Sequence, residues 1–288
     1  MKGEEKKMAY RFQVIGYPIQ HSLSPWIHNQ FMEAAKIQGE YTKNEIKPEQ
    51  LKEKFEQIKR DRVQGFNVTV PHKQEIIHLL DDMDDTAEKM GAVNTVAHQE
   101  GKWIGFNTDG TGYVRSLKMK HAELFSNMEN KKILILGAGG AARAIFYELF
   151  KNGFKQIHLA NRTVEAAQQL ANLTGGKTDT KVFSLKDVEE KIEEYDLIVQ
   201  TTSVGMVPNE MQSIVSLFNV KKSAVVSDIV YQPIKTTLLK QAEKAGAKIH
   251  FGHTMLLYQA QTAFEIWTGV RPDTKNMDER LRDLLEGR

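Results

Sequence analysis

One chemical signal in the chain is a glycine-rich turn between an apolar strand and a helix. A predicted strand at Lys132–Leu136 leads into this turn, which starts at Gly137 and is followed by a helical stretch to about Lys151. The first glycine of such a turn permits the tight bend, and the second lets the backbone approach a pyrophosphate. The helix N-terminus then offers free amides to the anion. Ala142 occupies the third glycine position, which the fingerprint tolerates, so the pattern predicts a dinucleotide-binding domain.

The end of the next predicted strand indicates which nicotinamide cofactor this turn would accept. An Asp or Glu there would accept hydrogen bonds from the ribose 2′-hydroxyl of NAD. The chain instead places Asn161-Arg162-Thr163 after the strand Gln156–Ala160. A guanidinium suits a 2′-phosphate better than a hydroxyl, so these residues favour NADP. The structural alternative is that Arg162 only caps a surface loop.

Polar side chains also gather at predicted strand ends in the first third of the chain. Open α/β sheets bind their ligands at the carboxyl ends of strands. Each cluster alone has a structural explanation, such as a helix cap at Ser24 or a turn at Asn107–Gly110. Together, ahead of a dinucleotide domain, they favour a second ligand site. The clusters are Ser22-Leu23-Ser24, Asn67-Val68-Thr69, His72-Lys73, Asn94-Thr95 and Asn107-Thr108-Asp109-Gly110.

In this order, these motifs resemble the shikimate dehydrogenase family over essentially the whole chain from Tyr10 to about Gly269. A lone glycine fingerprint is a weak signal, whereas the complete ordered set is specific. The matching segments are His21-Ser-Leu-Ser-Pro25, Asn67-Val-Thr-Val-Pro-His-Lys73, Gly91-Ala-Val-Asn-Thr95, Asn107-Thr-Asp-Gly110, Gly137–Arg143, Asn161-Arg-Thr163, Thr202-Ser-Val-Gly-Met206, Asp228-Ile-Val-Tyr231 and Met255–Phe264 with Gln259.

The resemblance implies reversible, NADPH-dependent reduction of 3-dehydroshikimate to shikimate, on the route to chorismate and the aromatic amino acids. Its implied catalytic pair is Lys73 and Asp109. The substrate carboxylate would be held by the hydroxyls of Ser22 and Ser24. The ring hydroxyls would be bound by Thr69, Asn94 and Gln259, with Asn67 and Tyr231 nearby.

The same resemblance distributes the cofactor over three segments. The pyrophosphate would lie on Gly137, Ala138, Gly139, Gly140 and Ala141, and the adenosine ribose phosphate on Asn161, Arg162 and Thr163. The nicotinamide would be flanked by Met206, Ile229 and Gly252. Asp85 occupies a position that the family sometimes assigns to the cofactor, but we interpret Asp81–Asp85 as a solvated helix start. Tyr258 departs from the small residue expected beside Gln259, and it changes either the packing or the pocket wall.

A lysine and a carboxylate suit the implied reaction. Hydride transfer to a carbonyl carbon leaves negative charge on the carbonyl oxygen, which a neighbouring ammonium stabilises and can protonate. Because a permanently charged lysine is a poor proton acceptor near neutral pH, three roles stay open for Lys73: buried proton carrier, member of a water relay, or mainly electrostatic group. The structural alternatives are a surface lysine at a helix start and, for Asp109, a helix cap.

Two runs of alternating strands and helices surround these motifs. The fold class predicted is α/β: a mostly parallel substrate domain and a Rossmann-type, doubly wound dinucleotide domain. Residues 8–113 and 250–288 are predicted to form the substrate domain, and residues 114–249 the NADP domain. Residues 1–7 are interpreted as a solvated leader. Closure of two such domains around a cleft would shield the reaction from water.

Composition excludes several other classes of function. The chain has 288 residues, a net charge of only +2 and no cysteine, so disulfides, thiolate nucleophiles and Cys-held metal sites are excluded. The balanced charge gives no case for nucleic-acid binding, and no apolar stretch approaches the roughly 18 residues of a membrane span. We therefore expect a cytoplasmic monomer or homodimer that binds a small molecule. No metal is expected, because the chain has no H-E-x-x-H pattern and His250-Phe-Gly-His253 lacks a companion carboxylate at metal-site spacing. His253 is interpreted as a loop residue.

Three alternatives to this function stay open. The nearest is a quinate/shikimate dehydrogenase with relaxed use of NAD and NADP, which a comparison of both substrates with both cofactors would separate. A non-catalytic nucleotide-binding sensor would be expected to lack the lysine or the aspartate, and both are present here. A one-carbon folate dehydrogenase shares the two-domain layout, but the Ser22–Ser24 and Asn107–Asp109 clusters do not point to it.

Overall fold

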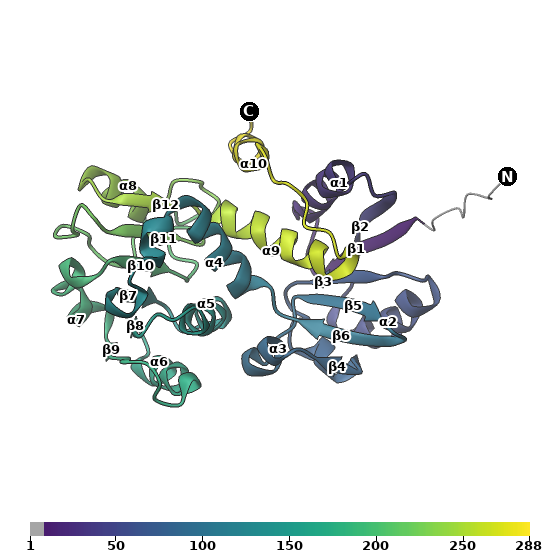
Figure 1. The fold of residues 1–288 in the computed structure, drawn as a ribbon, viewed down its shortest axis with the longest axis horizontal. Helices are drawn as coiled ribbons and strands as arrows, with labels where there is room; N and C mark the ends of the chain where they lie inside the picture. Colours follow the sequence, from purple (N-terminus) through teal and green to yellow (C-terminus); the bar gives the residue numbers. More distant parts are fainter. Residues whose placement is uncertain (1–8) are drawn as a thin grey trace. The chain divides into compact units, whose positions relative to one another are not determined.

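The structure, a computed structural model, describes residues 9–288 and divides into two compact units. Unit 1 runs to Thr108 and includes Ala260–Thr274, and unit 2 comprises Asp109–Gln259 and Lys275–Arg288. Both units combine a six-stranded sheet with helices (Figure 1), which confirms the predicted α/β fold class. The expected solvated leader, residues 1–7, lies outside the described residues.

Unit 1 is built on a mixed sheet with the strand order β2-β1-β3-β5-β6-β4. β1 is parallel to β2 and β3, whereas β5 is antiparallel to both of its neighbours and departs from the expected parallel pattern. A two-residue hairpin turn, in which Glu100 (φ 51°) and Gly101 (φ 80°) both have positive φ, accounts for the antiparallel pairing of β5 with β6. The elements are β1 (Tyr10–Gly16), α1 (Ser24–Ala35), β2 (Gly39–Glu45), η1 (Pro48–Gln50), α2 (Leu51–Arg60), β3 (Gly65–Val68), η2 (Glu75–Leu79), β4 (Asp82–Met83), α3 (Asp85–Met90), β5 (Thr95–Gln99) and β6 (Lys102–Phe106).

The acidic run Asp81–Asp85 is not simply the start of a helix. Asp82 lies in the short strand β4, which pairs with β6. Asp84 is the N-cap of α3, and its side chain accepts a hydrogen bond from the Ala87 amide at 2.8 Å. The helix therefore does begin within the run, but the two residues before the cap are held by sheet pairing.

Aromatic side chains hold the second half of α9 (Gly252–Thr268) in unit 1. The Trp267 ring stacks on Phe12 with a centroid distance of 4.6 Å, and its Nε1 donates to the Val96 carbonyl at 2.9 Å. Gly65 leaves room for the indole, because a Cβ there would lie 2.8 Å from Trp267 Cε2. This packing attaches the returning chain to the sheet.

Unit 2 has six parallel strands in the order β12-β11-β10-β7-β8-β9. This is the Rossmann order, with its switch point between β7 and β10. The three central strands β7, β10 and β11 are mostly apolar and almost entirely buried, as parallel strands between two helix layers must be. The elements are α4 (Asp109–Lys120), η3 (Ala122–Phe125), η4 (Met128–Asn130), β7 (Lys132–Leu136), α5 (Gly140–Lys151), β8 (Gln156–Ala160), α6 (Val164–Ala171), η5 (Asn172–Thr174), β9 (Val182–Phe183), α7 (Leu185–Glu189), η6 (Ile192–Glu194), β10 (Leu197–Gln200), β11 (Val225–Asp228), α8 (Thr237–Lys244), β12 (Lys248–His250), the first half of α9, and α10 (Met277–Leu285).

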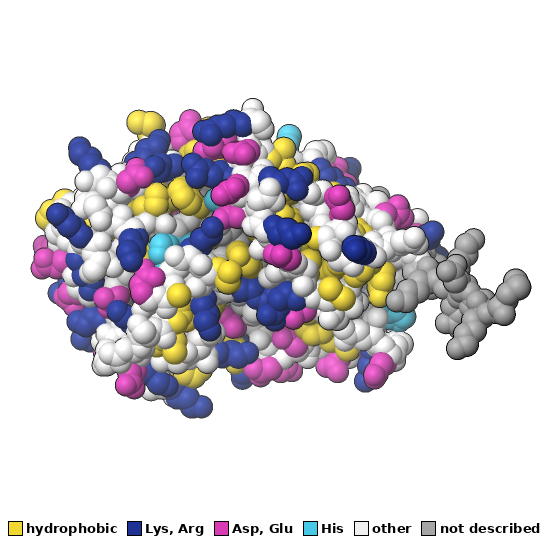
Figure 2. Space-filling view, turned by 45° about the horizontal axis from the view of Figure 1, so that its top comes forward, with side chains coloured by type: hydrophobic (Ala, Val, Ile, Leu, Met, Phe, Trp, Pro, Cys, Tyr) yellow, Lys and Arg dark blue, Asp and Glu magenta, His cyan; other side chains and the backbone are white. Residues whose placement is uncertain are grey.

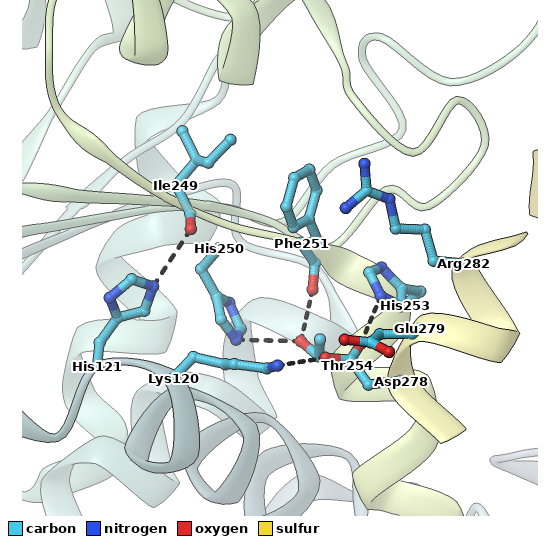
Figure 3. Close-up of a pocket in the computed structure, with 10 residues that line it drawn as sticks. All are labelled: Lys120, His121, Ile249, His250, Phe251, His253, Thr254, Asp278, Glu279 and Arg282. Atoms are coloured by element: carbon cyan, nitrogen blue, oxygen red, sulfur yellow. Dashed lines mark hydrogen bonds and ion pairs between the residues drawn. The ribbon is translucent and has the colours of Figure 1, made fainter. Parts of the chain in front are cut away.

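The C-terminal helix α10 groups with unit 2, whereas the predicted division places residues 250–288 together in the substrate domain. Three side chains account for this difference. Figure 3 shows Lys120 and His253 converging on Asp278 of α10, and the His253 Nε2 to Asp278 Oδ1 distance is 2.7 Å. His253 is therefore a buried residue of α9 rather than a loop residue, and its carboxylate partner lies 25 positions further along the chain. The functional division of the chain stays a prediction.

The surface carries both signs of charge. On the face drawn in Figure 2, basic and acidic side chains are interspersed rather than gathered by sign. Within the described part of the chain, none of the helices combines the length and apolar composition that a membrane span requires. Across residues 9–288, no group of three or more histidine, aspartate or glutamate side chains is arranged to hold a metal ion.

Candidate active site

The proposed substrate residues of unit 1 lie at or just beyond the ends of its strands. Asn67 is in β3, Thr69 follows that strand, and Asn94 immediately precedes β5. The Asn94 carbonyl accepts from the Val68 amide at 2.8 Å, and the Thr69 amide donates to Ile15 of β1 at 2.9 Å. The sheet thus brings together Asn67, Thr69 and Asn94, which stand up to 27 residues apart in the sequence.

A continuous hydrogen-bond network joins the side chains of Asn67 and Asn94 with those of Thr95 and Thr108. Asn67 Nδ2 donates to the Asn94 carbonyl at 3.2 Å and to Thr95 Oγ1 at 3.1 Å. Asn94 Oδ1 accepts from the Thr108 amide at 2.9 Å and from Thr95 Oγ1 at 3.0 Å, and Asn94 Nδ2 donates to Thr108 Oγ1 at 2.9 Å. All four residues are buried. Such a network holds its amides in single orientations, which is what recognition of a polyhydroxylated ring needs.

Ser22 and Ser24 are half-buried at the start of α1. Ser24 is the first helical residue rather than the predicted N-cap, since Leu23 takes the cap position without a side-chain cap bond. The Ser22 hydroxyl accepts from the Ser24 amide at 3.3 Å. Two hydroxyls beside the positive end of a helix dipole suit a carboxylate ligand.

The main chain of Lys73 is fixed next to Asn94. Its carbonyl accepts from the Val93 amide at 2.8 Å, and the preceding His72 is buried with Nε2 2.6 Å from the Ile46 carbonyl. The Lys73 side chain is half-buried. These contacts of Lys73 and His72 therefore fix the main chain from which the lysine side chain extends.

In unit 2 the glycine-rich turn lies at the switch point of the sheet. Gly137 follows β7 with φ 115°, and a Cβ there would meet Thr201 Oγ1, just beyond β10, at 2.5 Å. Gly139 and Gly140 open α5, and a Cβ on either would meet nothing within 4 Å. The turn therefore exposes its main chain next to the free amides at the start of α5, and open space surrounds Gly139 and Gly140. That arrangement fits a pyrophosphate.

The residues after β8 fit the remaining phosphate of NADP. Asn161 Nδ2 donates to the Thr163 carbonyl at 2.8 Å, which closes the loop around Arg162. Arg162 and Thr163 are exposed, and Thr163 is the N-cap of α6 without using its side chain as a cap. A guanidinium and a hydroxyl at a helix N-terminus can bind a 2′-phosphate, and no carboxylate stands in Asn161–Thr163 to repel it.

Of the three predicted nicotinamide contacts in unit 2, Met206 and Ile229 lie in loops and Gly252 begins α9, and Ile229 and Gly252 touch. A Cβ on Gly252 would lie 2.5 Å from the carbonyl carbon of Ile229, so these backbones are in direct contact. Met206 is 46% exposed, and the next amide, of Val207, donates to the Gln232 carbonyl at 3.1 Å. This bond places the Met206 loop beside the segment that carries Ile229.

Asp109 and Gln259 belong to unit 2, where close helix packing positions both. Asp109 begins α4, and a Cβ on the next residue, Gly110, would lie 2.9 Å from Glu148 Cβ on α5. A Cβ on Gly112 would lie 2.5 Å from Gln259 Cα on α9. Gly110 and Gly112 therefore let α4 pack closely against both α5 and α9.

Comparison with known proteins assigns the family. Three family models match: shikimate dehydrogenase substrate binding domain at residues 14–96, shikimate / quinate 5-dehydrogenase at 120–233 and shikimate 5′-dehydrogenase C-terminal domain at 252–282. A protein of Oceanobacillus iheyensis named shikimate dehydrogenase (NADP(+)) is 48% identical over 282 residues, covering 98% of this chain and 100% of that protein. The chain belongs to the shikimate dehydrogenase family.

Solved structures of shikimate dehydrogenases resemble the chain over nearly its whole length. The Thermus thermophilus enzyme, in complex with NADP(H) and shikimate, is 34% identical with a TM-score of 0.83, covering 95% of this chain and 98% of that one. The Listeria monocytogenes enzyme, in complex with shikimate and NAD, is also 34% identical, with a TM-score of 0.87 and coverage of 98% and 100%. These neighbours confirm the family resemblance seen in the motifs.

Sequence reasoning did not assign a role to Asp228, which supports a loop of this shikimate dehydrogenase fold. Its carboxylate accepts from the Val230 amide at 2.9 Å, Thr236 Oγ1 at 2.7 Å and Gln200 Nε2 at 3.3 Å. Burial raises the pKa of Asp228 to about 7, although the bonds from Thr236 and Val230 oppose this shift. The carboxylate shapes the turn that carries Ile229 and Tyr231. The motif Asp228-Ile-Val-Tyr231 is the sequence signal for this turn. Its aspartate accepts the hydrogen bonds that shape the turn, and Ile229 and Tyr231 are the predicted contact residues.

Proposed function

We propose that this protein catalyses the reversible, NADP-dependent interconversion of 3-dehydroshikimate and shikimate, on the route to chorismate and the aromatic amino acids. The observation that carries the proposal is 48% identity over 98% of the chain to a shikimate dehydrogenase (NADP(+)), together with the amide and hydroxyl network of unit 1. The open glycine turn and the Arg162 loop of unit 2 fit NADP on their own geometry. NADPH, when bound, supplies the hydride.

The chain's own residues would divide the remaining work. Ser22 and Ser24 would bind the carboxylate, and Thr69, with the network residues Asn94 and Asn67, would orient the ring. Gln259 and Tyr231 would add contacts from unit 2. The ammonium of Lys73 would donate the proton to the substrate oxygen as negative charge develops there, and Asp109 would orient that lysine and the hydroxyl. On the cofactor side, Met206, Ile229 and Gly252 would flank the nicotinamide.

The role of Lys73 is tested by Lys73→Ala. We expect kcat to fall by about two to four orders of magnitude, the usual contribution of a positioned general acid, while NADPH affinity stays unchanged. Shikimate oxidation followed by NADPH absorbance measures the first quantity, and NADPH fluorescence titration the second. Near-normal turnover in this variant would remove Lys73 from the mechanism.

Cofactor and substrate strictness are decided by the same assay run with shikimate or quinate and with NADP or NAD. Fast reduction of NADP alone by shikimate supports the proposal, and comparable rates with all four combinations support a relaxed quinate/shikimate dehydrogenase. No turnover by folded protein that binds NADP would favour a sensor. We also propose a cytoplasmic location and a monomeric or homodimeric state, which light scattering after size exclusion distinguishes.

A further inference from the structure

Gln200, the last residue of β10, has a buried side chain whose orientation is fixed by its neighbours. The Thr202 amide can only donate, so the side-chain atom of Gln200 that it faces is the acceptor Oε1. The carbonyls of Thr202 and Val204 can only accept, so the atom 3.0 Å from each of them is the donor Nε2. Both ends of this amide therefore hold the loop that follows β10.

The same residue also holds the turn after the neighbouring strand. Its main-chain carbonyl accepts from the Ile229 amide at 3.1 Å, just beyond β11. Its Nε2 lies 3.3 Å from Asp228 Oδ1, the atom that accepts from the Val230 amide. Because Nε2 has two hydrogens and three acceptors around it, this longest contact shares a hydrogen with one of the loop carbonyls. Gln200 thus connects the loop after β10 to the turn after β11.

Met206 lies between two hydrogen-bonded points of the loop after β10. Its side chain is 46% exposed, so burial in a core does little to hold it. The Met206 amide donates to the Ser203 carbonyl at 3.1 Å, within the part of the loop that Gln200 holds. On the other side, the Val207 amide donates to the Gln232 carbonyl at 3.1 Å. Loss of the Gln200 side chain would therefore loosen the loop on the side that leads into Met206.

We propose that Gln200 is a positioning residue for the nicotinamide end of NADP. This inference rests on the proposed function, in which Met206 and Ile229 flank the nicotinamide. With 1% exposure, Gln200 is too buried to contact the cofactor itself. It acts through the two flanking residues, holding the loop of Met206 by its side chain and the Ile229 amide by its carbonyl.

The adenosine end of NADP would not depend on this side chain. The proposed function places that end on the Arg162 loop and the glycine turn that starts at Gly137. The main chain beside this turn is anchored separately, because the Thr201 amide and Thr201 Oγ1 both donate to the Leu136 carbonyl, at 3.0 and 2.7 Å. Loss of the Gln200 side chain should therefore disturb the nicotinamide and spare the adenosine phosphate.

The experiment compares wild type with Gln200→Met, which keeps the length of the side chain and removes its hydrogen bonds. Hydride transfer is measured in a single turnover with saturating shikimate, as the rise in NADPH absorbance, at enzyme concentrations high enough that the rate no longer increases. This rate should fall about tenfold or more, because small displacements of reacting atoms are costly. Calorimetry with adenosine 2′,5′-bisphosphate, which carries the 2′-phosphate but no nicotinamide, should give a Kd within about twofold of wild type.

Gln241→Met is the matched control. It makes the same exchange in unit 2 and removes an Oε1 that accepts from the Leu217 amide at 3.3 Å, in the connection between β10 and β11. It should keep both the wild-type rate and the wild-type Kd. A rate in Gln200→Met within about twofold of wild type overturns the inference. A loss of bisphosphate affinity as large as the loss of rate also overturns it, because the effect would then extend to the whole cofactor site.

Wild type alone separates the remaining outcomes. If it neither binds NADP nor oxidises shikimate, the proposed function and this inference fail together. If it oxidises shikimate while Gln200→Met keeps the wild-type rate, the inference alone fails. Should Gln200→Met not fold, hydrogen exchange of wild type decides. The Thr202 amide, bonded to Gln200 Oε1, should exchange at least about a hundredfold more slowly than in an unfolded chain, and exchange at the unfolded rate would contradict the inference.

Discussion

Replacing Asp278 with asparagine should destabilise unit 2 at neutral pH and have less effect as the solution is acidified. Asp278 lies on α10, where it accepts from His253 Nε2 at 2.7 Å and pairs with Lys120 (Figure 3). Burial by itself would raise the pKa of this carboxyl. The hydrogen bonds from His253 and Lys120, with their charges, outweigh burial and lower the pKa from 3.8 to about 2.

The sign of the pH dependence follows from this lowered value. Because the folded-state pKa of Asp278 is below the unfolded-state value, the unfolded chain binds more protons between them, and folding stability rises with pH there. The contribution is complete above about pH 5 and is lost as the pH falls from about 4 to about 2. The difference between 3.8 and about 2 corresponds to about 2.4 kcal/mol. The carboxylate keeps 18% exposure, so solvent screening leaves about 1–2 kcal/mol.

Thermal unfolding of wild type and Asp278→Asn at a series of pH values measures this effect. For a unit of this size, about 1–2 kcal/mol corresponds to a Tm difference of about 2–8 °C at pH 7. About half of that difference should remain at pH 3. Asp283→Asn, an exposed carboxylate on the same helix, is the control and should change Tm by much less. A Tm difference of equal size at pH 3 and pH 7 would refute the charge pair as its source.

Two further predictions concern the cofactor side of unit 2. Gly252→Ala would place a Cβ 2.5 Å from the Ile229 carbonyl carbon and 2.6 Å from the Val230 oxygen. It should lower the unfolding free energy by about 1–3 kcal/mol and raise the KM for NADP, as denaturation and steady-state kinetics would show; an unchanged KM would separate Gly252 from the cofactor. Arg162→Gln should weaken NADP binding about tenfold or more and leave NAD binding nearly unchanged, measured by titration. Equal losses for both cofactors would mean that Arg162 does not contact the 2′-phosphate.

Much of the fold could be predicted because its strands carry their signal locally. Lys132–Leu136 and Gln156–Ala160 have the predicted bounds. Buried parallel strands are nearly continuous apolar runs, which a local pattern identifies. Pairing direction is different, because the antiparallel pairing of β5 with β6 depends on the backbone conformation of Glu100 and Gly101. The local sequence does not indicate that Glu100 would adopt a positive φ.

The site could be predicted where its residues form a consecutive motif. It could not be predicted where it depends on contacts between residues that are far apart in the sequence. The glycine turn after β7 lies at the switch point, as the motif indicates. Tyr41 stands among polar and charged neighbours on β2, and its partner Asn67 is 26 residues away. His253 and Asp278 are 25 residues apart. Neither pair follows a local sequence spacing, because only the fold brings its two residues together.

The two units present their polar groups in opposite ways, and this sets which substitutions each tolerates. In unit 1 the proposed binding groups are side chains, whose direction is imposed by fixed backbone donors and acceptors at Asn94 and Thr108. In unit 2 they are largely backbone amides, exposed because Gly139 and Gly140 have no side chain. A change of side-chain polarity in unit 1, at Asn94 for example, should therefore alter substrate choice while NADP affinity stays constant. In the glycine turn, by contrast, the same cofactor affinity should fall with any added Cβ, whatever its polarity, because the Cβ would occupy the space in front of the amides.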